Sequence, residues 1–196
     1  MHIEQIELKL KDMLPEDIFE NALKVRDLCY NLARYHDCDP DRLAVAGILH
    51  ECGKIYNSDE LISKAEDFDI PITEMVLTSP IEILHGIIGS NLAKEIFAVE
   101  DNEILTSIKH HNYGANEMTI FTKILFVASK IYKFDSKYIN EVNEIKEVAT
   151  KDIDKSVMMT FDLLLKGFIE EGKLINNQIV NSRNKMILSL KPENKI

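Results

Sequence analysis

Helical periodicity runs through nearly the whole chain, and it limits the fold more than any other feature of the sequence. Apolar residues recur every three or four positions over residues 15–35 and in several later segments, whereas no segment alternates apolar and polar residues as a half-buried strand would. The pairs Asp39-Pro40 and Ser79-Pro80 each place a proline directly after a capping residue, and this order is typical of helix starts. We therefore expect an all-α protein.

The periodic segments divide the chain into a series of helices joined by short connections. The expected helices cover residues 15–35, 40–50, a short stretch from 58, 81–97, 102–111, 118–132, 152–171 and 177–189. Residues 133–151 are the most polar stretch, and we expect a mobile connection there. We also expect the tail after Leu190 to fray. Because no linker or internal repeat divides the sequence, we predict one helical domain over residues 1–196.

Composition excludes several classes of function. A formal net charge of −10 without a cluster of basic residues argues against a nucleic-acid binder. The apolar runs are much shorter than the roughly 18–20 residues that a membrane span needs. The first residues lack the basic and then apolar pattern of a secretory signal, so we expect a cytoplasmic protein. The three cysteines have no CxxC spacing, and we expect free thiols. The sequence does not fix an oligomeric state.

Four histidines occupy helix ends or lie beside glycines on three consecutive helices. His50 closes an apolar helix and is followed by Glu51, His85 lies near the start of a helix, and His110 and His111 end the next one. Taken singly, each is more simply a structural residue, and a histidine pair at a helix C-terminus complements the helix dipole. Together, imidazoles and a carboxylate are ligands for ions such as zinc and iron. Convergence of these side chains would make a metal site.

Four motifs in register resemble one known family. The run Leu-His-Glu-Cys-Gly-Lys at 49–54 resembles the HD signature, and the segments 79–86, 108–114 and 118–128 follow in the expected order and spacing. Together they resemble the YqeK family of HD-domain proteins, which are symmetrical dinucleoside tetraphosphate hydrolases. The resemblance covers about residues 15–175. It implies an HD-domain helical bundle whose metal centre splits diadenosine tetraphosphate into two diphosphates.

The resemblance also assigns roles to individual residues. In the family, a two-metal centre that usually contains iron is built from an early histidine, the His-Asp pair, two later histidines and a late aspartate. This chain keeps His50, His85 and His111, and it keeps Lys54 as the expected phosphate contact. The resemblance thus implies a small-molecule nucleotide as ligand and a divalent metal, with iron as the expected ion.

Three ligand positions of the family are changed in this chain. Asn21 stands in place of the early histidine, Glu51 in place of the HD aspartate and Ser129 in place of the late aspartate. Asparagine and serine are poor ligands for a transition metal, so we expect one metal site rather than two. A glutamate keeps the charge of an aspartate but moves the oxygens by one methylene group.

Three hypotheses follow from this pattern. The first is a metal-dependent phosphohydrolase that acts on dinucleoside polyphosphates or related nucleotides, with one ion held by His50, Glu51, His85 and His111 and with His110 or a bound water assisting. The second is a catalytically impaired homologue that binds a nucleotide or a protein partner. The third is a helical interaction domain whose histidines are only structural. Metal content and hydrolysis of diadenosine tetraphosphate discriminate among them.

Overall fold

The computed structural model describes residues 2–134 and 136–190, and over this part of the chain it contains helices and no β-strand. The helices are α1 (Ile3–Lys11), α2 (Glu16–Ala33), α3 (Pro40–Leu49), α4 (Ser58–Asp67), α5 (Glu74–Thr78), α6 (Pro80–Glu95), α7 (Asn102–His110), α8 (Ile120–Phe134), α9 (Ile139–Ala149), α10 (Ile153–Glu170) and α11 (Asn177–Leu190). A 3-10 turn, η1 (Cys52–Ile55), follows α3. The expected all-α class is confirmed.

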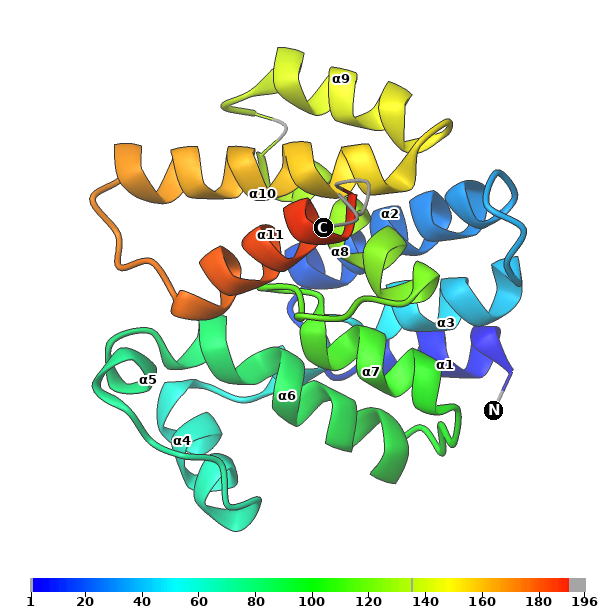
Figure 1. Ribbon diagram of the computed structural model, residues 1–196. Coiled ribbons are helices and arrows are strands. Elements are labelled where there is room, and N and C mark those ends of the chain that lie inside the picture. Colours follow the sequence, from blue (N-terminus) through cyan, green and yellow to red (C-terminus); the bar gives the residue numbers. More distant parts are fainter. Residues whose placement is uncertain (1, 135, 191–196) are drawn as a thin grey trace.

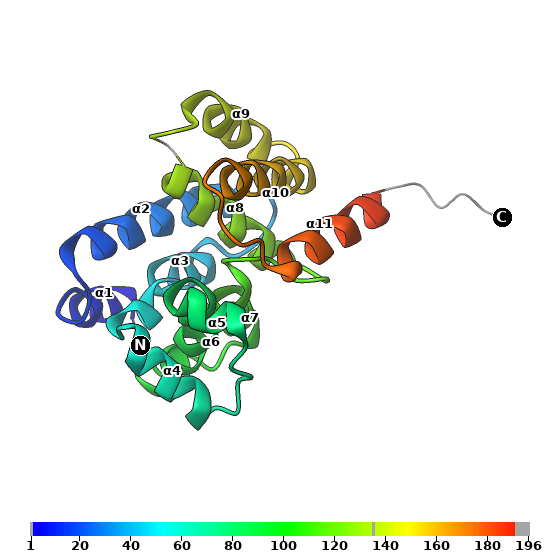
Figure 2. The ribbon, with the colours of Figure 1, turned by 90° about the vertical axis from the view of Figure 1, so that its left-hand side faces the viewer.

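The helices pack in two groups around α2 and α8. Helices α9 and α10 lie on one side of this pair, and α3, α6 and α7 lie on the other (Figures 1 and 2). Helix α11 lies level with the pair, on the far side of α8 from α2 (Figure 2). Helix α2 packs along α3 and α8, α6 packs on α7 and η1, and α10 contacts α8, α9 and α11. Helices α4 and α5 lie outside α6 (Figure 1). The turn after α3 is thereby held against α6, which brings two of the histidine-bearing segments together.

Helix α8 forms the centre of the hydrophobic core. Most of its side chains are buried, and the run 124–128 is fully inaccessible to solvent. Burial of this apolar surface drives the packing of the surrounding helices. None of the helices in the described chain is long and apolar enough to cross a membrane.

Local capping chemistry sets the helix starts. The side chain of Asp39 accepts hydrogen bonds from the backbone N–H groups of Asp41 and Arg42, at 3.0 and 3.1 Å, and Pro40 opens α3 as expected. The helix expected from residue 58 is capped one position earlier, by Asn57. The Asn57 side chain and that of Glu60 satisfy each other's backbone N–H groups in a capping box.

The expectation of a mobile connection over residues 133–151 is wrong. Residues 139–149 form helix α9, which buries Val142, Ile145 and Ala149 against α10. Each turn of α9 contributes about one buried apolar residue, and the polar residues between these positions made the segment resemble a connection in the sequence.

Gly172 lies directly after the α10 C-cap with φ +61°, the left-handed conformation that ends many helices. The tail expected to fray, after Leu190, lies outside the described residues.

Candidate metal centre

The end of α3 places two potential ligands next to each other. His50 is the C-cap of α3. The backbone of Glu51, with φ −98° and ψ 4°, is no longer α-helical, because the chain turns into η1 at this residue. Both side chains are buried. The turn lies so close to α6 that a Cβ atom at Gly53 would be 2.1 Å from the backbone oxygen of His85. Glycine at this position therefore allows the His50-Glu51 corner to meet the His85 helix.

The four expected ligands converge. One ligand atom from each of His50, Glu51 and His111 can be chosen so that all lie within 4.8 Å of one another. His85 joins this group, because its Nε2 atom is 3.0 Å from Nε2 of His111 and 3.7 Å from a carboxylate oxygen of Glu51. These side chains come from α3 and its C-terminal turn, from α6 and from the end of α7.

The main chain fixes the orientation of each imidazole ring. The Nδ1 atom of His50 lies 2.7 Å from the carbonyl of Gly47, that of His85 lies 2.5 Å from the carbonyl of Ile81, and that of His111 lies 2.7 Å from the carbonyl of Ile108. A carbonyl only accepts hydrogen bonds, so each Nδ1 carries the proton and donates it. In a neutral ring the Nε2 atom is then unprotonated, and its lone pair is free to accept a hydrogen bond or bind a metal ion.

These lone pairs face one another, and this arrangement fits a metal ion. Two unprotonated Nε2 atoms, of His85 and His111, lie 3.0 Å apart and neither can donate to the other. Among the described residues, Nε2 of His50 has no hydrogen-bond partner although it is buried. A cation between the rings would remove both the repulsion and the unsatisfied acceptor. Histidine ligands typically donate their other ring N–H to a carbonyl, as all three do here.

Burial and neighbouring charges keep these donors in their ligating forms. Burial lowers the pKa of His85 to about 4. Burial, with His85 and His50 nearby, also holds the pKa of His111 well below its ordinary value. Burial alone would raise the pKa of the Glu51 carboxyl, but contacts with His50, His85 and Lys54 outweigh it and hold that pKa well below the usual range. At neutral pH the centre therefore offers an ionised carboxylate from Glu51 and neutral imidazoles from His85 and His111.

The centre lies at one side of a pocket of about 340 Å³, the metal pocket. Its lining includes Lys54, whose Nζ is 2.6 Å from a Glu51 oxygen, together with Asn21 and Ser129, two of the three positions where the resemblance implies a replaced ligand. The Ser129 hydroxyl donates to the carbonyl of Phe126 at 3.0 Å. These three residues thus line the same pocket as Glu51, His85 and His111.

His110 does not join the centre. It lines an adjacent hollow together with Tyr113 and Gly114 and is absent from the residues that line the metal pocket. The reason is geometric, because successive residues of a helix point about 100° apart and His111 already faces the pocket. The expected assisting role of His110 therefore has no structural support.

The sequence analysis missed a buried lysine in the pocket. Lys130 is 3% exposed, and its ammonium group donates to Oδ1 of Asn112 at 2.6 Å. Burial, with Lys133 nearby, holds the pKa of Lys130 well below its ordinary value. Asn112 in turn donates to the carbonyl of Glu82. A lysine inside the apolar run of α8 was the available signal, because a charge in such a run is costly unless it serves a site.

Comparison with known proteins finds related sequences and a related structure. A family model described as the HD domain matches residues 18–133. The symmetrical bis(5'-nucleosyl)-tetraphosphatase of Staphylococcus aureus is 25% identical over 94% of this chain and 94% of its own length. A protein of the same name from Bacillus subtilis is 23% identical over 77% of this chain and 79% of its own.

The fold also matches a solved structure. The crystal structure of an HD superfamily hydrolase from Clostridium acetobutylicum, described as involved in NAD metabolism, superposes with a TM-score of 0.87. The two chains are 25% identical, and the match covers 96% of this chain and 98% of the other.

Proposed function

This chain belongs to the HD domain family, and from that premise we propose that it is a metal-dependent phosphohydrolase that cleaves symmetrical dinucleoside tetraphosphates into two nucleoside diphosphates. The observation that carries the proposal is the buried cluster of His50, Glu51 and His111, with His85 in contact with two of its members, Glu51 and His111. The names of the bacterial relatives give the substrate class.

The four donors would hold one divalent ion. Three imidazoles and a carboxylate suit borderline ions, and we propose iron among them. An ion bound there supplies Lewis acidity and positive charge for hydrolysis of a phosphoanhydride. Asn21 and Ser129 line the same pocket but are poor ligands, so one ion fits the residues better than two.

Two lysines of the pocket would position the phosphate chain. Lys54 lies at the mouth with its side chain 28% exposed, and it is already paired with Glu51. Lys130 lies inside, where Asn112 orients its ammonium group. Charge-assisted contacts to phosphate oxygens strengthen where water is excluded. These residues would hold the substrate with its central phosphates against the metal centre.

The decisive experiment measures metal and product together. The protein is purified without a His tag, its iron, zinc and manganese are quantified, and it is incubated with diadenosine tetraphosphate while ADP release is followed. We expect bound metal and ADP as the product. Bound metal without ADP release would favour the impaired homologue that only binds nucleotide, and absence of bound metal even after reconstitution would refute the proposal.

Two neighbouring histidines provide a matched pair of variants. His111→Ala removes a ring that faces the centre, whereas His110→Ala removes the adjacent ring that faces the next hollow. We expect the first variant to lose bound metal and the second to retain it. Equal metal content in the two variants would contradict the assignment of His111.

A further inference from the structure

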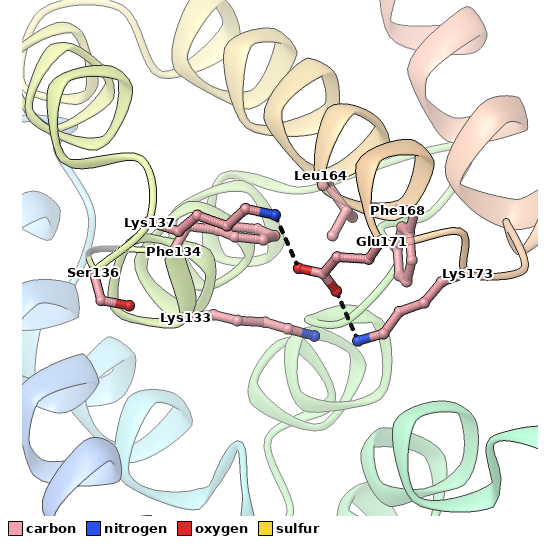
Figure 3. A pocket seen from close by; sticks show the side chains of 9 residues that line it. Lys133, Phe134, Ser136, Lys137, Leu164, Phe168, Glu171 and Lys173 are labelled. Carbon is pink, nitrogen blue, oxygen red and sulfur yellow. Dashed lines mark hydrogen bonds and ion pairs between the residues drawn. The ribbon is translucent and has the colours of Figure 1, made fainter.

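A second pocket lies between the end of α8 and the C-terminal half of α10. It has a volume of about 250 Å³, and its apolar wall comes from Phe134, Leu164 and Phe168. Three lysines reach into it from different segments, namely Lys133, Lys137 and Lys173 (Figure 3). With Glu171 as the one acidic residue among those that line it, the lining carries a formal charge of +2, three positive charges less one negative, in a chain whose net charge is −10.

An internal carboxylate already occupies the point where the lysines meet. One oxygen of Glu171 is 3.4 Å from Nζ of Lys137, and the other is 2.9 Å from Nζ of Lys173 (Figure 3). Two further carboxylates flank the pocket, because Lys137 is also 3.4 Å from Glu170 and Lys133 is 3.6 Å from Glu82. The arrangement shows that this point suits an oxyanion held from two sides.

The second pocket adjoins the metal pocket. Lys133 lines both, so the two pockets meet at this side chain. The metal pocket, at about 340 Å³, lies near the lower end of the roughly 300–1,000 Å³ typical of small-molecule sites. A dinucleoside tetraphosphate cut at its centre carries two nucleosides that leave the metal in opposite directions, so one half must continue beyond this pocket.

We propose that the second pocket binds the outer phosphate and nucleoside of one half of a dinucleoside polyphosphate, with Lys137 and Lys173 on the phosphate. The inference rests on the proposed function for the identity of the ligand. On binding, the phosphate takes the place of the Glu171 carboxylate between the two lysines. Exposed ion pairs stabilise proteins little, so the exchange costs little. The outer phosphate carries one negative charge and two unbridged oxygens, as the Glu171 carboxylate does, so it can take the same place between the lysines, and its nucleoside adds contact with the apolar wall of Phe134, Leu164 and Phe168.

Glu171 then acts as a competitor for the site. In the free protein its carboxylate pairs with Lys137 and Lys173 and competes with other anions for them. This makes the two partners of one ion pair respond in opposite directions: loss of Lys173 weakens ligand binding, whereas loss of the Glu171 charge strengthens it. A purely structural ion pair would not separate the two variants in this way.

The test measures binding without requiring hydrolysis. The probe is a diadenosine tetraphosphate analogue with a methylene group in place of the central bridging oxygen, and its affinity for the metal-loaded protein is measured by calorimetry. Lys173→Met and Glu171→Gln are compared with Lys151→Met and Glu147→Gln. The control pair Lys151–Glu147 has the same 2.9 Å separation as Lys173–Glu171 and lies on the surface at the end of α9.

We expect Lys173→Met to weaken binding of the analogue about fivefold and Glu171→Gln to strengthen it severalfold, whereas the control variants stay within twofold of the wild type. Equal affinities for Lys173→Met and Lys151→Met, or no gain from Glu171→Gln over Glu147→Gln, would overturn the inference. Failure of the proposed hydrolysis would appear separately, as lack of ADP release from the natural substrate by the wild-type protein.

Discussion

Acid should destabilise this protein through His85, and the structure gives the size of the effect. Burial lowers the pKa of this imidazole from 6.5 to about 4 in the folded protein. Between pH 6.5 and about pH 4, the unfolded chain therefore binds a proton at His85, whereas the folded chain does not. The contribution of His85 to stability is complete above pH 6.5 and is lost as the pH falls toward 4.

The magnitude follows from the two pKa values. Between pH 7 and pH 4.5, proton binding by the unfolded chain at this one site lowers the free energy of unfolding by about 2.5 kcal/mol. For a chain of this size the melting temperature falls by roughly 5–10 °C as a result. His111, whose pKa is also lowered by burial, acts in the same direction.

The assay is urea unfolding of the metal-free protein at the two pH values, for the wild type and for His85→Gln. Because carboxylates also titrate in this range, the informative quantity is the difference between the two proteins. We expect the wild type to lose about 2.5 kcal/mol more than the variant. The control His2→Gln, at the exposed N-terminal end, should behave as the wild type. Equal losses in wild type and His85→Gln would refute the view that burial holds this ring neutral.

Three further predictions concern the metal pocket. The double change Asn21→His with Ser129→Asp restores two family ligands on the pocket wall, so bound metal measured by elemental analysis should rise, and no gain would contradict a retained family geometry. Gly53→Ala should lower the free energy of unfolding in urea by about 3 kcal/mol or more, because its Cβ would overlap the backbone oxygen of His85; a loss below about 1 kcal/mol would contradict this. Lys130→Met should reduce kcat/KM for diadenosine tetraphosphate about 10–100-fold with metal content unchanged, since one charge-assisted phosphate contact is lost; unchanged kinetics would rule out that contact.

The sequence predicted the helices that carry strong local signals. Asp39-Pro40 and the apolar run of α8 define their helices through capping and burial, which act over a few residues. Helix α9 was not predicted, because only Val142, Ile145 and Ala149 are buried against α10 and the polar residues between them suggested a loop. These buried positions do recur at helical spacing, but a stripe of one apolar residue per turn does not show that α10 packs against it.

The candidate site was predicted in outline for a different reason. The resemblance to HD-domain proteins singled out His50, His85 and His111 among six histidines, whereas periodicity alone could not place their rings at one point. His110 was given an assisting role because it stands beside His111, and the sequence does not show that the two rings point in different directions. Lys130 was missed although its place in the apolar run of α8 was a signal, because the same helix also carries Lys123 and Lys133 and the sequence does not show which of the three is buried.

The carbonyl bonds to the three Nδ1 atoms make the helix backbone, rather than neighbouring side chains, the holder of the imidazoles. Substitutions elsewhere on the pocket wall leave those bonds untouched. A lineage could therefore exchange outlying ligands, as at Asn21 and Ser129, while its imidazole cluster kept its shape. Variation in this protein is then expected to alter how many ions are held before it alters where an ion is held.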